Sequence, residues 1–159
     1  MSLAWQDYTE AQFQEVMDFA QEYMDFLSKG KTERRFLKLA IEKAEAAGYR
    51  NIEEIIKNKE TLHPQDKVYM NQMNKSIALM HIGNEPLEQG MNILGAHIDS
   101  PRLDLKQHPL YEEGDLAFFD THYYGGVKKY QWVTIPLAIY GVVVLKSGKV
   151  IDIEIFIYE

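Results

Sequence analysis

His97 and Asp99 are the two residues of this chain whose types and spacing are best suited to chemistry. The apolar run before them predicts a buried strand over residues 91–97, and Pro101 predicts its end because proline cannot donate a hydrogen bond to a sheet. Residues two apart on an extended backbone point to the same side, so an imidazole and a carboxylate are expected side by side. A metal-bound histidine needs an acceptor for its second ring N–H, and a neighbouring aspartate provides one. The pair is therefore a candidate metal or catalytic site.

The same two residues also have a simpler interpretation, a structural pair in which a neighbouring carboxylate satisfies a buried histidine. Spacing alone leaves both interpretations open. Asp104 and Lys106 flank the pair and would either support a site or form an exposed ion pair. The remaining histidines are predicted to be surface or packing residues: His63, His81, His108 and His122.

The composition is typical of a soluble globular protein, because 46% of the residues are apolar and 26% are charged. The net charge of -7 argues against a nucleic-acid-binding surface, which requires a basic patch. Cysteine is absent from the sequence, so a metal would be held by histidine or carboxylate side chains, and a cytoplasmic location is expected. We expect no signal peptide, because no basic stretch leads into an apolar one, and no membrane span, which needs ~20 apolar residues.

Three helices are predicted in the first part of the chain, over residues 9–29, 32–48 and 51–56. The first begins with a capping-box sequence, and Thr32 and Asn51 are suitable N-caps for the other two. Apolar residues of the first helix recur at the helical period and are predicted to pack in the core: Phe13, Val16, Met17, Ala20, Tyr23, Met24 and Leu27.

The pattern then changes to that of strands. Residues 67–70 and 76–82 predict a hairpin, joined by the polar turn 71–75. Together with the strand at 91–97, this arrangement predicts an α/β fold with helices on a mixed sheet.

From Leu105 onward the sequence predicts a separate, β-rich unit. His108-Pro109 and residues 111–115 are predicted to form a polar, acidic connection, and Ser147-Gly148 is a hairpin signal. Three strands are predicted there: residues 117–124, 131–145 and 149–158. The last strand alternates cleanly between apolar and polar residues and has no element after it to cover its edge, which predicts an incomplete polypeptide.

One combination of motifs is specific. Gly-Ala-His-Ile-Asp-Ser-Pro-Arg-Leu-Asp-Leu-Lys, residues 95–106, is followed by Tyr-Gly-Gly at 124–126 and by Trp132. This combination closely resembles the N-terminal part of the aspartyl aminopeptidase family of zinc metallopeptidases. The resemblance also includes residues 109–112 and 136–143 and extends upstream to Thr32, so it covers most of the chain.

The resemblance implies a hydrolase that releases N-terminal residues from a peptide substrate and has two zinc ions per active site in the complete enzyme. In such enzymes the histidine of the motif is a zinc ligand, here His97. The aspartate two residues later is the catalytic-site residue that supports this ligand, here Asp99. The family has an α/β catalytic domain interrupted by a β-rich domain used in homo-oligomer assembly. Residues 1–104 would then be the N-terminal part of the catalytic domain, and residues 105–159 part of the oligomerisation domain.

Two departures limit what the resemblance implies. Many members have an Asp-Arg pair after the tryptophan, whereas this chain has Val133-Thr134-Ile135, which indicates a divergent bacterial-type branch. This difference weakens the expectation of a preference for acidic N-terminal residues. Family members are also much longer, and their other ligands and their general-base glutamate lie beyond this sequence. Catalytic zinc needs about three protein ligands, so the chain alone is expected to be inactive.

The alternative function is a non-catalytic oligomerisation or binding module derived from the same family. The bare strand at 149–158 favours it, because an exposed strand can pair with the sheet edge of a partner. No nucleic acid and no membrane is expected as a partner under either interpretation.

Overall fold

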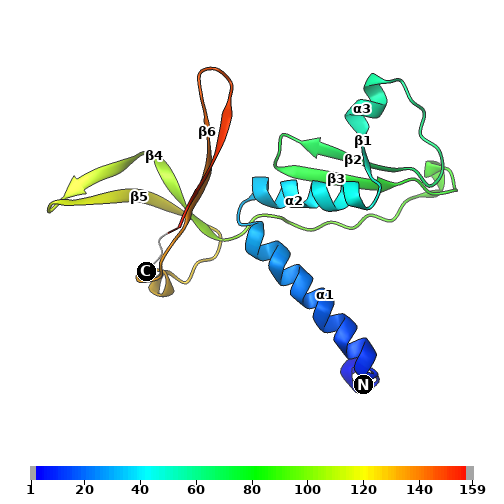
Figure 1. The fold of residues 1–159 in the computed structure, drawn as a ribbon, viewed down its shortest axis with the longest axis horizontal. Coiled ribbons are helices and arrows are strands. Elements are labelled where there is room, and N and C mark those ends of the chain that lie inside the picture. Colours follow the sequence, from blue (N-terminus) through cyan, green and yellow to red (C-terminus); the bar gives the residue numbers. More distant parts are fainter. Residues whose placement is uncertain (1–2, 157–159) are drawn as a thin grey trace. The chain divides into compact units, whose positions relative to one another are not determined.

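The computed structural model describes residues 3–156 and has a mixed α/β architecture, with helices and a mixed sheet followed by two hairpins (Figure 1). The chain divides into two compact units, Met1–Ile98 and Asp99–Glu159. The fold class therefore agrees with the sequence prediction. No helix within residues 3–156 is both long enough and apolar enough to cross a membrane.

The first unit contains the three predicted helices, α1 (Glu10–Lys29), α2 (Glu33–Ala46) and α3 (Ile52–Lys57). Each begins at a side chain that accepts a hydrogen bond from the first turn: Thr9 in a capping box, Thr32 from the N–H of Arg35, and Asn51 from that of Glu53. These caps satisfy N–H groups that have no partner inside the helix. The unit also contains short 3-10 turns at Ala4–Gln6 and Leu87–Gln89.

The mixed sheet of the first unit consists of β1 (Arg50–Asn51), β2 (Lys67–Gln72) and β3 (Ser76–His81), in that order. β1 runs parallel to β2, and β2 runs antiparallel to β3 with Tyr69 opposite Leu79. The predicted hairpin is confirmed, and its turn places Met73 and Asn74 at positive φ.

The core of the first unit lies between the sheet and two of its helices, since α2 contacts β3 while α3 contacts β1 and β2. The buried apolar residues come from α2, α3 and β2: Leu37, Ala44, Ile55, Val68 and Tyr69. The packing predicted for the apolar residues of α1 was wrong. No residue of this helix is buried, and Phe13 keeps 47% of its surface exposed. α1 contacts α2 along its second half, where the rings of Phe26 and Phe36 meet edge to face at 4.8 Å and Lys43 of α2 forms an ion pair with Glu22.

The predicted strand at residues 91–97 is also not formed. Residues 90–101, all of them described, contain no strand or helix, and Leu94 is fully exposed. A strand exists only where a neighbouring backbone completes its hydrogen bonds, and the described residues place none beside this segment. The apolar pattern was therefore correctly recognised, but the pairing that would turn it into a strand is missing.

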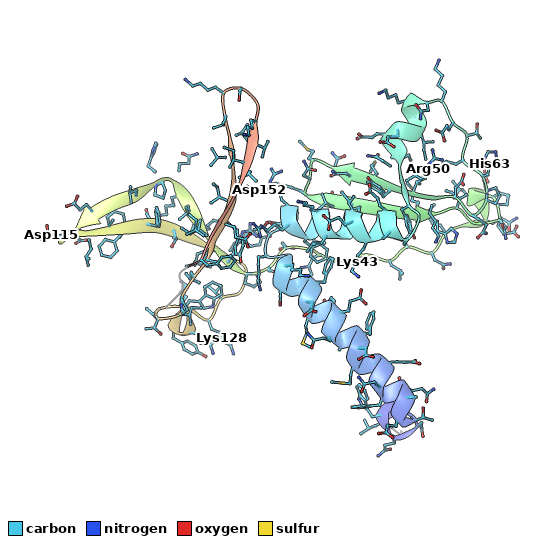
Figure 2. All side chains as sticks on the ribbon, viewed as in Figure 1. Lys43, Arg50, His63, Asp115, Lys128 and Asp152 are labelled. Carbon is cyan, nitrogen blue, oxygen red and sulfur yellow. The ribbon has the colours of Figure 1, made fainter. Side chains whose placement is uncertain are left out.

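The second unit consists of two antiparallel hairpins. β4 (Arg102–Glu113) pairs with β5 (Leu116–Tyr124), and Asp115 lies at positive φ in the turn between them (Figure 2). The polar connection predicted at His108-Pro109 and at 111–115 was wrong up to residue 113, because β4 extends to Glu113. Cross-strand pairs explain this, because Tyr111 stacks on Phe118 with the ring centroids 5.4 Å apart.

The second hairpin pairs β6 (Ile139–Val144) with β7 (Val150–Ile155), and Gly148 adopts φ +83° in the predicted turn. The strand predicted from residue 131 begins later, because residues 132–138 are irregular and Pro136 has no N–H to donate. The last residues of the strand predicted at 149–158 lie outside the described part of the chain.

Candidate active site

Asp99 is held by the end of the β4–β5 hairpin. The hydroxyl of Tyr124 donates a hydrogen bond of 2.8 Å to Oδ2 of Asp99. Tyr124 is the last residue of β5 and pairs with Arg102, the first residue of β4. The carboxyl group that the sequence singled out is therefore oriented by a residue 25 positions further along the chain.

The ring of Tyr124 is itself covered by a cation. The guanidinium carbon of Arg102 lies 4.2 Å from the ring centroid, a cation–π arrangement. Nε of Arg102 donates a 2.7 Å hydrogen bond to Oδ1 of Asp104. Four side chains thus form a continuous sequence of contacts from Asp104 through Arg102 and Tyr124 to Asp99.

The backbone beside this cluster is closely packed. Gly125 has φ +77°, and a Cβ atom at this position would lie 3.3 Å from Cα of Pro101. Glycine suits the site for two reasons, because it adopts positive φ without strain and leaves room for the proline. The second glycine of the Tyr-Gly-Gly motif, Gly126, has open space around the corresponding position.

His97 lies in the exposed segment that precedes this cluster. Imidazole nitrogen and carboxylate oxygen are both ordinary zinc donors, so His97 and Asp99 fit the metal in kind. Two such residues are too few, because catalytic zinc takes about three protein ligands. Within residues 3–156, no three side chains of the His, Cys, Asp and Glu types lie close enough together to hold a metal ion. We therefore derive no reaction step through zinc from this chain.

The residues predicted to flank the site form ion pairs. Asp104 accepts from Arg102, and Nζ of Lys106 lies 3.0 Å from Oδ2 of Asp120. The side chains of Lys106 and Asp120 are about half exposed, so their pair contributes little to stability. Of the other histidines, His122 stacks on Tyr123 at 5.4 Å between ring centroids.

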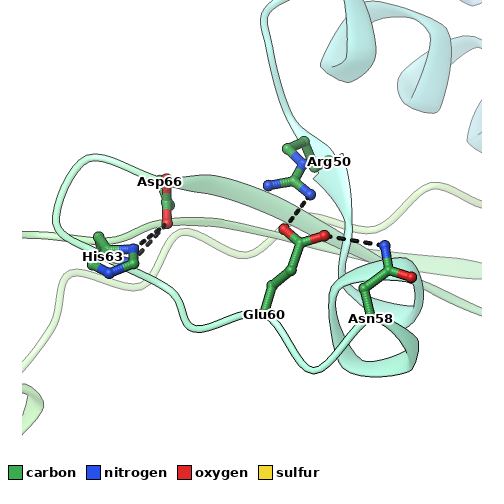
Figure 3. A network of polar contacts seen from close by, with 5 residues as sticks. All are labelled: Arg50, Asn58, Glu60, His63 and Asp66. Atoms are coloured by element: carbon green, nitrogen blue, oxygen red, sulfur yellow. Dashed lines mark hydrogen bonds and ion pairs between the residues drawn. The ribbon is translucent and has the colours of Figure 1, made fainter.

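A second polar cluster lies in the first unit, around Arg50 (Figure 3). Nη2 of Arg50 donates a 2.5 Å hydrogen bond to Glu60, which also accepts from Asn58 at 3.1 Å. The hydrogen bond from Arg50 is the main reason that the pKa of Glu60 is lowered. Asp66 in turn accepts from the backbone N–H of His63 at 2.7 Å. Each carboxylate is matched by a donor, so the cluster fixes the loop before β2 and has no feature that calls for a ligand.

A large effect on a titrating group is found at Tyr69, in the core of the first unit. Its hydroxyl donates a 2.7 Å hydrogen bond to Oε1 of Glu45, and this bond, together with burial, raises the pKa of Tyr69 to about 12. The neutral phenol is therefore the form that the folded unit favours. Tyr69 is a structural residue that connects β2 to α2.

Sequence reasoning did not identify Tyr124 as the donor to Asp99, or Arg102 as the cation over the ring of Tyr124. The signal was present, because Tyr124 opens the Tyr-Gly-Gly motif and Arg102 follows Pro101 in the His-x-Asp motif. Only the strand register of the hairpin brings the two motifs together.

Comparison with known proteins gives a consistent result. The family described as "Aminopeptidase I zinc metalloprotease (M18)" matches residues 26–158 of the chain. A probable M18 family aminopeptidase 1 of Clostridium acetobutylicum is 54% identical over 150 residues, which make up 94% of this chain and 32% of the relative. The chain thus spans about a third of the length of the curated relatives that it matches.

Solved structures have the same fold. The crystal structure of aminopeptidase I from Borrelia burgdorferi B31 matches with a TM-score of 0.89 and 43% identity, over 96% of this chain and 37% of that one. Aminopeptidase I from Clostridium acetobutylicum matches with a TM-score of 0.81 and 52% identity, over 96% and 34% of the respective chains.

Proposed function

Because the chain belongs to the M18 family of aminopeptidases, we propose that it supplies the N-terminal part of a zinc-dependent aminopeptidase. In this proposal His97 is a ligand of one of two zinc ions, and Asp99 is the carboxylate that supports it. The complete enzyme would release N-terminal residues from peptides. Bound zinc would supply a water of lowered pKa and polarise the peptide carbonyl.

The observation that carries this proposal is the anchoring of Asp99 two residues after His97. A supporting carboxylate is useful only if its orientation is fixed, because it must hold a ligand in one position. The 2.8 Å hydrogen bond from Tyr124 and the close approach of Gly125 to Pro101 supply this fixation in the chain itself.

The chain alone is proposed to be inactive. Catalytic zinc takes about three protein ligands and an open position, and the described residues gather no such set. The other ligands would come from sequence that corresponds to the remaining two thirds of the relatives.

The domain organisation follows from the same proposal. Residues 1–104 are assigned to the catalytic domain and residues 105–159 to a β-rich domain used in assembly. The exposed apolar side chains of the β6–β7 hairpin support assembly, as Val144 and Val150 are each more than half exposed. A homo-oligomer in the cytoplasm is the proposed state, and its substrate is a peptide.

A chimera tests the proposed function directly. Residues 1–159 of this chain would replace the matching third of the Clostridium acetobutylicum relative, to which it is 54% identical. We expect the purified chimera to bind zinc and to release the N-terminal residue from peptides. The His97→Ala variant should lose activity by at least about a hundredfold, because a zinc ligand is removed.

His81→Ala is the matched control, because it removes another exposed histidine of the first unit. It should leave activity within about twofold, as expected for an exposed side chain away from the site. A chimera that keeps full activity and zinc after His97→Ala would refute the assignment of this ligand.

The second candidate is a non-catalytic module that binds through its exposed strands. The exposed residues of the β6–β7 hairpin favour it, because exposed apolar strand edges associate readily. Size-exclusion chromatography with light scattering on the 159-residue chain separates the two. A single stable oligomer supports a module, and polydisperse aggregates support an incomplete enzyme.

A further inference from the structure

We propose that Tyr124 and Arg102 are positioning residues that fix the carboxyl group of Asp99 in one orientation. This inference rests on the proposed function, in which Asp99 supports a zinc ligand. The inference goes beyond the proposed function because it assigns a role to two residues at the strand ends of the β4–β5 hairpin.

The hydroxyl group of Tyr124 is positioned by the β4–β5 hairpin. Arg102 and Tyr124 are the final cross-strand pair of the hairpin, so their backbones are held by the β4–β5 ladder. From this fixed position Tyr124 reaches back to Asp99 and donates to Oδ2 at 2.8 Å. Asp99 is only partly buried. This hydrogen bond favours one of the staggered positions that the side chain of Asp99 can adopt.

The ring of Tyr124 is held by Arg102. The guanidinium of Arg102 lies 4.2 Å from the ring centroid, and Asp104 fixes that guanidinium through a 2.7 Å hydrogen bond. The planar guanidinium suits both contacts at once, because it stacks on the ring and donates in its own plane. The orientation of Asp99 is thus determined by three side chains of a rigid hairpin.

The backbone between Asp99 and β4 is also held in place. Only Ser100 and Pro101 separate Asp99 from β4, and the ring of Pro101 packs against Gly125. Gly125 directly follows Tyr124, so the same turn that ends β5 also holds the backbone next to Asp99. Side-chain and backbone contacts therefore fix the same residue, which is what a precisely held site requires.

The functional test uses Tyr124→Phe in the chimera, since this change removes one oxygen atom and keeps the ring over Arg102. We expect kcat for peptide hydrolysis to fall about tenfold with KM and zinc content unchanged, as for other residues that orient a ligand indirectly. Tyr123→Phe is the matched control. It removes the same atom from the neighbouring residue on the opposite face of β5, and should leave kcat within about twofold.

A double-variant cycle separates positioning from general stability. In the Asp99→Ala background, Tyr124→Phe should lower kcat by less than about twofold, because the acceptor of the tyrosine hydroxyl is already absent. Effects that multiply fully, or a kcat for Tyr124→Phe equal to that for Tyr123→Phe, would overturn the inference.

A structural readout on the 159-residue chain keeps the inference testable if the chimera is inactive. Amide hydrogen exchange of Ser100 and Arg102 should become about threefold faster in Tyr124→Phe and remain unchanged in Tyr123→Phe, because only the former releases Asp99. Equal exchange in both variants would refute the positioning role. Failure of the proposed function alone would appear differently, as a chimera that keeps its activity after His97→Ala.

Discussion

Strand β2 and the segment at residues 91–97 have similar apolar sequences, but only one of them is a strand. In β2, Val68 is completely buried between strands on both sides and helices α2 and α3 nearby. In the other segment Leu94 is completely exposed, and no described residue pairs with its backbone. The comparison teaches that an apolar run specifies a preference for burial, whereas neighbouring backbone decides whether a strand forms.

The difference also explains how this chain relates to its longer relatives. β2 obtains both of its neighbours from the stretch between β1 (Arg50–Asn51) and β3 (Ser76–His81). The 91–97 segment has no such local neighbours, while the relatives contain about twice as much additional sequence. Its apolar residues Ile93 and Leu94 therefore stay exposed within the described part of the chain.

The largest effect is predicted for a charge placed in each of the two segments. Val68→Asp should lower the free energy of unfolding of the first unit by about 3 kcal/mol or more, because a carboxylate would be buried without a partner. Leu94→Asp should change it by less than about 0.5 kcal/mol, as this side chain is already in water. Urea denaturation followed by circular dichroism measures both. Equal losses would mean that the exposed segment is packed in solution.

A smaller effect is predicted at the close approach of Gly125 to Pro101, within the second unit. Gly125→Ala should destabilise that unit by about 2 kcal/mol, because alanine is strained at positive φ and its Cβ would crowd Pro101. Gly114→Ala is the matched change, since Gly114 also has positive φ but open space around it. It should cost about 1 kcal/mol. Thermal unfolding of both variants isolates the contribution of the proline contact.

The pH dependence of stability should further distinguish the buried core of the first unit from the exposed segment at residues 91–97. The pKa of Tyr69 is raised to about 12 in the folded unit and is near 10 in the unfolded chain, so the folded form binds the proton more tightly. This contribution is complete below pH 10 and is lost as the pH rises from about 10 to 12. Tyr69→Phe should remove this loss and also cost on the order of 1 kcal/mol at neutral pH, because Glu45 loses its donor.

The control for this measurement is Tyr111→Phe, which changes an exposed tyrosine of the second unit. Urea melts between pH 8 and pH 12 should show the same decline in this variant as in the unchanged chain. An identical decline in Tyr69→Phe would mean that another group causes it.

The sequence was sufficient for the features that are encoded locally. The three helix starts at Thr9, Thr32 and Asn51 were predicted because a cap is a contact between residues two or three apart. The β2–β3 hairpin was predicted because its turn residues lie between its strands. Such contacts leave a pattern within a few residues, so one sequence is enough to find them.

The contacts that fix the candidate site are of another kind. Asp99 and Tyr124 are 25 residues apart, and their hydrogen bond depends on the register of the β4–β5 hairpin. That register shifts between Leu105 and Leu110, and Pro109 predicts a break in the ladder there but not the size of the shift. Residue types and a family resemblance therefore identified His97 and Asp99, whereas the partners of Asp99 required the structure.

The smallest effects are predicted for two helix caps. One belongs to α2, which contributes to the buried core of the first unit, and the other to the exposed helix α1. Thr32 and Thr9 make equivalent caps, with side-chain oxygens 3.4 and 3.3 Å from the N–H groups of Arg35 and Gln12. Thr32→Ala should lower the free energy of unfolding of the first unit by about 1 kcal/mol, because α2 contributes buried residues to the core. Thr9→Ala should leave it within about 0.3 kcal/mol, since α1 buries none and its first turn can open by itself. Faster amide exchange should then be confined to the first turn of α1. An equal loss of unfolding free energy in Thr9→Ala and Thr32→Ala would mean that α1 unfolds together with the core. The apolar face of α1 would then have to be buried in solution.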